Sequence, residues 1–211
     1  MIITLDDRRV DMTVEPDCSL QTLLDRIRAA CPDRLIVSVA INGRSLADAE
    51  LQEALHQPVA ADAQVDLHTS EARELVADAL RGLALEFGQA RRKCGDLACR
   101  LTGGESAAAL RDIGECIGLW QTCHRVLGQC GGLLGDNLVT YEHAERPVQH
   151  WFEQVIEKLV EVRQALEAHD LVLLADLVRY ELPTLCETWR DLLNDLAAQV
   201  QPVGAAEQPE A

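Results

Sequence analysis

Residues 72–134 read ARELVADALRGLALEFGQARRKCGDLACRLTGGESAAALRDIGECIGLWQTCHRVLGQCGGLL, and this stretch decides the architecture of the chain. Apolar side chains recur at alternating spacings of four and three residues on both sides of Gly103–Gly104. That period places them on one face of a helix. The two predicted stripes are Val76, Leu80, Leu83, Phe87, Ala90, Cys94, Leu97 and Leu101, and then Ala109, Ile113, Cys116, Trp120, Cys123, Leu127, Cys130 and Leu134. Because paired glycines are typical of a helix end and a turn, we expect two long antiparallel helices whose apolar faces further helices cover. Pairing about the turn places Phe87 near Trp120.

The composition favours a helical protein with an acidic surface. The 211 residues are 48% hydrophobic but only 3% aromatic, so we expect a core of Leu, Val, Ala and Cys, which suits a helix bundle. The net charge of -16 disfavours nucleic acid and anionic membranes as partners and leaves basic partners open, although solvated helix surface is the simplest explanation of the acidity. The sequence shows neither a secretory signal nor an apolar run of membrane-spanning length. The eight cysteines lie mostly in helical stripes, which predicts free thiols in a reducing cytoplasm.

Residues 1–70 have an apolar period of two, which is typical of strands. The strands are expected at residues 1–5, 10–14, 35–41 and 65–68. The third is almost continuously apolar, so we predict a central position buried on both faces. Ser19 is expected to cap a helix over Leu20–Ala30, and Asn42–Gly43 to form a tight turn. We expect Ser70 to cap the next helix.

Two stretches of this segment, VEPDCSL at 14–20 and INGRSL at 41–46, resemble parts of ubiquitin-like β-grasp domains. The first is similar to their strand-to-helix passage and the second to their third strand and the turn after it. The resemblance implies a β-grasp fold for residues 1–70. Carrier members of that superfamily work through a free C-terminal Gly-Gly, whereas Gly103–Gly104 and Gly131–Gly132 are internal here. The resemblance therefore implies a docking module rather than a carrier.

Two further helices follow a long irregular connection at 138–147. Their stripes are Val148, Phe152, Val155, Leu159, Val162 and Leu166, and then Leu171, Leu174, Val178, Leu182, Leu185, Trp189, Leu192 and Leu196. Pro183 is expected to kink the last helix. The corner at 166–176 resembles that of uncharacterised bacterial helical-bundle proteins, a likeness that implies no activity. We predict an α+β chain with a ubiquitin-like β-grasp domain at 1–70, an antiparallel four-helix bundle at 71–200 and a disordered tail at 201–211.

The cysteines and histidines do not predict a metal site. Cys116, Cys123 and Cys130 are spaced by seven residues, about 10.5 Å apart along a helix, so they cannot share one zinc ion. His143 and His150 flank the long loop without a metal-binding spacing, and we interpret them as solvated. No nucleotide-binding or hydrolase motif is present. We therefore predict no catalytic, cofactor-binding or metal-binding residues.

Aromatic side chains near the long loop and the Pro183 kink are the candidate partner-binding residues, because aromatic residues often anchor interfaces. They are Tyr141, Trp151, Tyr180 and Trp189, for which a core role is the simpler interpretation of the tryptophans. Our hypothesis is a non-enzymatic adaptor, scaffold or chaperone-like protein of the bacterial cytoplasm that binds another protein.

Two other hypotheses remain open at this point. One is a thiol- or metal-dependent enzyme that uses Cys94, Cys116 and His124 in the bundle core. The other is a structural homo-oligomer in which copies share a bundle stripe.

Overall fold

The computed structural model describes residues 1–12, 18–60, 62–103 and 105–201. The chain is α+β and divides into two compact units, Met1–Leu75 and a second that begins at Val76. Each unit has its own cluster of buried apolar side chains. Residues 14–17 of the predicted strand-to-helix passage lie outside the described residues, as does Gly104. Of the predicted tail at 201–211, the structure describes residue 201 alone.

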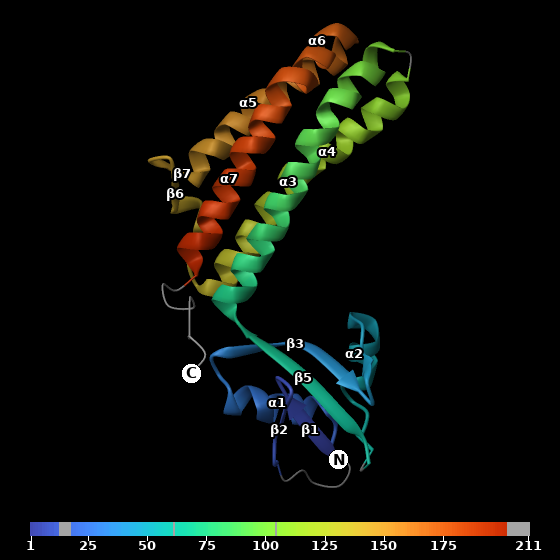
Figure 1. Ribbon diagram of the computed structural model, residues 1–211, viewed down its shortest axis with the longest axis vertical. Helices are drawn as coiled ribbons and strands as arrows, with labels where there is room; N and C mark the ends of the chain where they lie inside the picture. The colour runs from blue at the N-terminus through green and yellow to red at the C-terminus, as the bar shows by residue number, and fades with distance from the viewer. Residues whose placement is uncertain (13–17, 61, 104, 202–211) are drawn as a thin grey trace, which may run out of the picture. The chain divides into compact units, whose positions relative to one another are not determined.

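The first unit contains a five-stranded mixed sheet in the order β2-β1-β5-β3-β4 (Figure 1). Its strands are β1 (Ile2–Leu5), β2 (Arg8–Arg9), β3 (Arg34–Ile41), β4 (Arg44–Ser45) and β5 (Gln64–Glu71). The first and last strands, β1 and β5, are parallel neighbours, whereas β3 is antiparallel to β5. Helices α1 (Leu20–Ala30) and α2 (Asp48–Ala54) complete the unit.

Helix α1 forms where the sequence predicts it. The Ser19 hydroxyl accepts a hydrogen bond from the Thr22 amide and so caps the helix, as expected. The buried face is Leu20, Leu23, Leu24 and Ile27, which packs with strand residues such as Val65. The Asn42–Gly43 turn is also confirmed, because both residues have the positive φ angles of a tight hairpin turn.

Two strand predictions were wrong. The second strand is Arg8–Arg9 rather than 10–14, because Asp6 and Asp7 adopt positive φ angles and make a two-residue turn that returns the chain at once. Strand β3 is not central, since β5 lies in the middle of the sheet. The side chain of Val37, at a register shift in β3, is 46% exposed, so this apolar strand is not buried on both faces.

Ser70 does not cap a helix. Strand β5 runs on to Glu71, and Ser70 pairs with Leu35 of β3. Helix α3 begins directly at Ala72. The extended backbone persists because the β3–β5 ladder continues to the Arg34–Glu71 pair, whereas a cap was predicted from local sequence alone.

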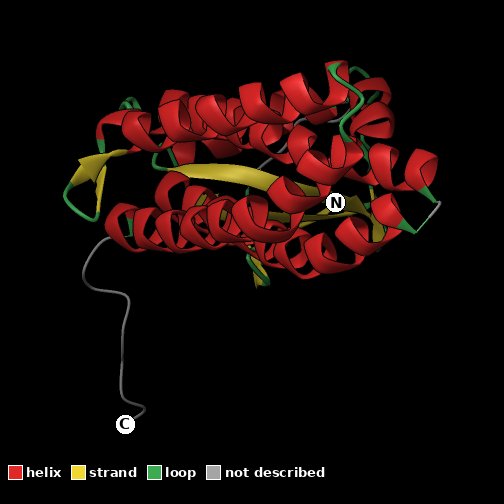
Figure 2. Ribbon diagram, turned by 90° about the horizontal axis from the view of Figure 1, so that it is seen from above, coloured by secondary structure: helices red, strands yellow, loops and turns green. Residues whose placement is uncertain are grey.

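Long helices dominate the second unit (Figures 1 and 2). Its elements are α3 (Ala72–Thr102), α4 (Ser106–Leu134), the 3₁₀ turn η1 (Leu138–Thr140), β6 (Glu142–His143), β7 (Arg146–Pro147), α5 (Val148–Glu167), α6 (Leu171–Asp176), the π-helical η2 (Leu177–Glu181) and α7 (Leu182–Val200). Gly135 ends α4 with a left-handed φ of 66°, which a side chain would strain. The 138–147 connection was predicted to be irregular. It contains instead the 3₁₀ turn η1 and the β6–β7 hairpin.

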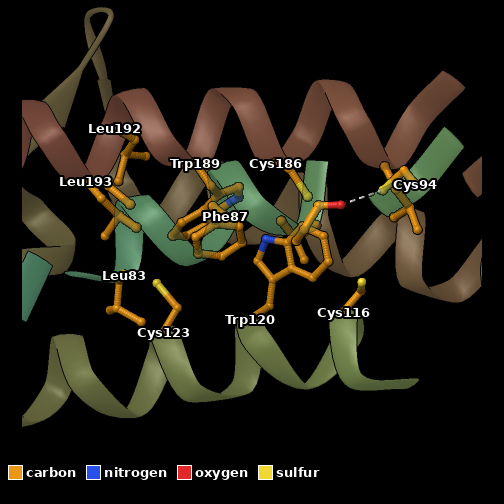
Figure 3. Packing of buried hydrophobic residues seen from close by; sticks show 14 of the residues in the cluster. Leu83, Phe87, Cys94, Cys116, Trp120, Cys123, Cys186, Trp189, Leu192 and Leu193 are labelled. Atoms are coloured by element: carbon orange, nitrogen blue, oxygen red, sulfur yellow. Dashed lines mark hydrogen bonds between the residues drawn. The ribbon is translucent and has the colours of Figure 1, made fainter. Parts of the chain in front are cut away.

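The two predicted stripes of α3 and α4 are confirmed as core. Every residue named for them is buried except Leu134, which packs partly buried against the same cluster. The rings of Phe87 and Trp120 lie 5.4 Å apart, as the helical pairing predicts, and Phe87 also stacks on Trp189 of α7 (Figure 3). These contacts join α3, α4 and α7 around one apolar core.

The last two stripes hold with two differences. Leu166 and Leu171 are exposed at the corner, and Ala165 is buried in place of Leu166. Before Pro183 the helix continues as η2, in which the Leu182 amide donates to the Leu177 carbonyl five residues back. Proline lacks an amide hydrogen and its ring collides with the preceding turn, so a wide π turn relieves the clash that we expected to produce a kink.

Candidate functional site

A groove of about 840 Å³ runs between α3 and α4. Side chains at helical spacing line it from both helices, because residues three and four apart share a helix face. Its apolar floor is Ala90, Leu97, Cys116 and Leu119. Its charged rim is Glu86, Lys93, Asp96, Arg100, Asp112 and Glu115. The groove therefore combines an apolar strip with two charged edges along the outside of the helix pair.

Arg100 closes one end of the groove through a charge network. Its guanidinium lies 2.7 Å from the carboxylate of Asp112, 3.5 Å from that of Asp96 and 3.4 Å from that of Glu105. The hydrogen bond to Asp112 is the main reason that the pKa of Arg100 is raised. Because three carboxylates surround it, this cation is already compensated within the protein.

The rest of the rim carries charges that the protein does not compensate. Within the described ranges, neither Glu86 nor Glu115 forms an ion pair, and Lys93 forms none either. Lys93 and Glu115 act in opposite directions on the pKa of the Cys116 thiol. The rim has four carboxylates and two cations, so its charge is net negative.

Cys116 forms part of the groove floor and is only 8% exposed. Burial raises the pKa of its thiol to about 11, so the group is neutral at neutral pH. A neutral buried thiol is a poor nucleophile and packs as a small apolar side chain.

The structure brings together two of the three residues of the thiol hypothesis. Cys94, Cys116 and Cys186 come from three different helices (Figure 3). A hydrogen bond from Cys186 lowers the pKa of Cys94, while the same contact and burial raise the pKa of Cys186. Cys94 also donates to the Ala90 carbonyl at 3.3 Å.

His124 is separated from these thiols. It lies about 12 Å from Cys116 along α4 at 1.5 Å per residue. Its ring is exposed and contacts the edge of Phe152 on α5 at a centroid distance of 5.3 Å. In the described part of the chain no histidine is hydrogen-bonded to Cys94 or Cys116, so the arrangement gives a thiol nucleophile no base.

Two of the predicted partner-binding residues flank the β6–β7 hairpin: Tyr141 precedes it and Trp151 lies in α5 after it. The hairpin stands out from the side of α5 (Figures 1 and 2). The Tyr141 hydroxyl donates to the Asp136 carboxylate at 2.8 Å, and the indole N–H of Trp151 donates to the His143 carbonyl at 3.3 Å. Both side chains are half-buried against the helical core. They fix the hairpin in place, which accounts for them without a partner.

His143 joins the same hairpin to α7. Its Nδ1 lies 2.6 Å from a carboxylate oxygen of Asp195, and the ring packs against the edge of Trp151. His150, the other loop histidine, contacts Trp151 and Gln154 instead. Among the residues that the structure describes, no group of three or more His, Cys, Asp or Glu side chains is arranged to hold a metal ion.

The remaining two candidates lie in very different environments. Tyr180 of η2 is 63% exposed, beside Arg179, whose guanidinium donates to the Cys99 sulfur at 3.5 Å. Trp189 is fully buried and packs between Phe87 and Phe152, with ring distances of 6.0 and 4.5 Å. Trp189 as a partner-binding residue is therefore a wrong prediction, because a side chain enclosed by the core cannot reach a partner.

The groove itself was missed by the sequence analysis. Its floor belongs to the edges of the α3 and α4 stripes, which the apolar period marks only as core. A weak signal existed in the small residues Ala90 and Cys116 of these stripes and in Gly118 beside them, since small side chains leave a shallow channel where helices meet. The depth depends on how two helices pack, which the period of either one does not specify.

Comparison with known proteins gives one match. A family model described as a domain of unknown function, DUF8042, matches residues 91–192. The match begins within α3, includes all of α4 and the β6–β7 hairpin, and ends within α7. No curated protein and no solved structure matches the chain. Most of the groove, from Lys93 to Thr122, falls inside the matched region.

None of the helices in the described ranges is both long and apolar enough to cross a bilayer. All eight cysteines are free.

Proposed function

We propose that this chain is a non-enzymatic protein-interaction module, an adaptor, scaffold or chaperone-like protein that binds a protein partner through the α3–α4 groove. The observation that carries the proposal is the groove, with its apolar floor and charged rim on the outside of two rigid helices. Apolar grooves between helices are a recurring binding site for partner helices. The unpaired thiols suit a reducing compartment such as the cytoplasm.

The first unit is proposed to be a ubiquitin-like β-grasp docking domain. The strand order β2-β1-β5-β3-β4, with parallel β1 and β5 in adjacent positions, supports this assignment. So does the packing of α1 in one core with the strands. A second partner would bind its exposed sheet surface, where Val37 is an accessible apolar side chain.

The second unit is proposed to be an acidic antiparallel four-helix bundle in which α6, η2 and α7 together form the fourth helix. Contacts between successive neighbours support a closed arrangement of helices. Arg91 of α3 pairs with Glu187 of α7 at 3.5 Å, and Lys158 of α5 pairs with Glu181 of η2 at 3.4 Å. His124 of α4 contacts Phe152 of α5. A bundle leaves grooves between neighbouring helices, which is the kind of surface that the proposal needs.

Affinity purification of the full-length chain with mass spectrometry tests this function. The test variant is Leu119→Lys, which places a charge on the half-buried groove floor. The matched control is Leu85→Lys, because Leu85 lies on α3 outside the groove lining and is 69% exposed. We expect Leu119→Lys to lose a protein that wild type and Leu85→Lys both retain. If both variants recover the same proteins as wild type, the groove is not the binding surface and the proposal fails.

Light scattering of the full-length chain distinguishes the homo-oligomer alternative from an adaptor that binds a different protein. A hetero-partner adaptor is expected to be a monomer at all concentrations. A concentration-dependent dimer that Leu119→Lys abolishes would assign the groove to a second copy instead.

A further inference from the structure

We propose that the occupant of the α3–α4 groove is a basic amphipathic helix, with an apolar stripe flanked by Lys or Arg. This inference rests on the proposed function and adds to it the chemistry of the partner. Three features support it: the dimensions of the groove, the charges on its rim and an unfilled glycine position in its wall.

The groove has the length of a short helix. From Glu86 to Arg100 the α3 wall spans about 21 Å at 1.5 Å per residue, or about four helical turns. Floor residues recur along this length, from Ala90 to Leu97 on α3 and from Cys116 to Leu119 on α4. A helix that docks in such a groove inserts side chains from one apolar stripe at spacings of three and four.

The rim selects a cationic partner. Arg100 is compensated by its three carboxylate neighbours, whereas Glu86 and Glu115 lie on opposite walls without ion pairs in the described part of the chain. A basic side chain on either flank of the occupant would meet one of these two carboxylates. Lys93 also lines the groove, but the four carboxylates of the rim outnumber its two cations. Complementary charges at a rim mainly set partner choice and association rate.

Gly118 lets an incoming helix approach closely. It lies in the groove wall within α4, and a Cβ built there would meet no atom within 4 Å beyond its chain neighbours and the backbone of its own helix. Glycine in a helix interior destabilises the helix relative to alanine, and nothing inside the protein needs the space. Because Gly118 lies in the groove wall, the backbone of a partner helix can approach closely at that point.

A second copy of this chain is a poor occupant. The chain carries a net charge of -16, so two copies repel each other. Helix α5, for example, exposes Glu153, Glu157 and Glu167, of which only Glu167 contacts a cation of that helix, Arg163 at 3.8 Å. Bringing such a helix to an acidic rim would place like charges together.

Peptide titration of the full-length protein tests the occupant. The probes are three fluorescein-labelled helical peptides of about 15 residues with the same leucine stripe, in which the flanking positions are all Lys, all Gln or all Glu. Fluorescence anisotropy gives the dissociation constants, and hydrogen exchange with mass spectrometry locates the bound site. The test variant is Glu115→Lys. Its matched control is Glu157→Lys, which makes the same charge change on α5, outside the groove lining.

We expect the Lys peptide to bind most tightly and to protect 86–100 and 112–122 from exchange. Glu115→Lys should weaken it by up to about fivefold, and Glu157→Lys by less than about twofold, since a rim charge pair contributes up to about 1 kcal/mol. Raising the salt from about 50 mM to about 500 mM should weaken the binding of this peptide further.

Three results would contradict the inference. Equal weakening by both variants would mean that only the net charge attracts the peptide. Tighter groove binding by the Gln or Glu peptide would overturn the cationic occupant but leave the proposed function standing. If none of the three peptides protects the groove, both the occupant and the proposed function fail.

Discussion

Replacing Gly118 with alanine should stabilise the protein and weaken partner binding. Beyond its chain neighbours and the backbone of its own helix, the new methyl group meets no atom within 4 Å, so the substitution introduces no clash. Alanine is favoured over glycine in a helix interior by about 1 kcal/mol, partly because glycine gives the unfolded chain more conformational freedom. For a chain of this size, about 1 kcal/mol corresponds to a rise in melting temperature of about 2–4 °C.

Intrinsic fluorescence during urea unfolding measures the change in the free energy of unfolding of the helical unit, which contains Gly118. The tryptophans, Trp120, Trp151 and Trp189, all lie in the second unit, so their emission follows the unfolding of the helices. The same substitution at Gly131 is the control within α4, because a Cβ there would lie 2.6 Å from the Asp136 carbonyl oxygen. Backbone must move to relieve that contact, so Gly131→Ala should destabilise by about 1–3 kcal/mol.

The link with binding needs a second control. Gly95→Ala on α3 also meets no atom within 4 Å, but Gly95 does not line the groove. It should stabilise as Gly118→Ala does and leave the affinity for the Lys peptide unchanged. The reasoning is refuted if Gly118→Ala lowers the free energy of unfolding, or if it raises that energy while the peptide binds as tightly as before.

Three further outcomes are expected. Asp6→Asn should destabilise by about 1 kcal/mol at pH 7, a value kept low because the carboxylate is partly exposed, and should speed hydrogen exchange in β5. Hydrogen bonds from the Thr69 amide and hydroxyl, both 2.7 Å, lower the pKa of Asp6, so its stabilisation is present above about pH 4 and is lost as the pH falls below its ordinary range. Trp189→Ala should lower the free energy of unfolding, followed by circular dichroism, by about 3–5 kcal/mol, because it leaves a cavity between the rings of Phe87 and Phe152. Iodoacetamide should modify exposed Cys99 in the native protein but reach Cys123, whose pKa burial raises to about 12, only after unfolding.

Each of these outcomes has a control. Asp11→Asn should have little effect, since Asp11 is almost fully exposed and its ion pair with Arg9 is long, at 3.7 Å; an equal effect would show that the Thr69 contacts are unimportant. Tyr180→Ala should change the stability by less than about 0.5 kcal/mol, because that side chain is 63% exposed. If the Trp189→Ala variant were as stable as the Tyr180→Ala variant, the result would contradict a core position for Trp189. Native modification of Cys123 at the rate of Cys99 would contradict its burial.

Features set by local sequence could be predicted. Helix α1 was placed correctly from its cap at Ser19 and its four-residue apolar face, because both signals lie within one short segment. The α3 and α4 stripes were predicted for the same reason, as was the Phe87–Trp120 contact, since a short turn between two helices fixes which residues face each other.

Features that depend on contacts between residues far apart in the sequence could not be predicted. The central position of β5 depends on its pairing with both β1 and β3, which the apolar run of β3 cannot reveal. The same pairing keeps Ser70 extended. The β6–β7 hairpin turns at Ala144 and Glu145, which have positive φ angles without the usual Gly or Asn, so no turn signal marked it. Pro183 marked a break, but not that the break would be a π turn.

A photo-crosslinking residue placed in the groove tests the central claim most directly. The full-length chain would carry it at position 119 in one variant and at exposed position 85 in the other, in the cells that naturally make the protein. The account predicts that irradiation joins position 119, but not position 85, to a partner through a basic helical segment, and that Glu115→Lys abolishes the adduct. Identical adducts from both positions, or none from position 119, would contradict the account.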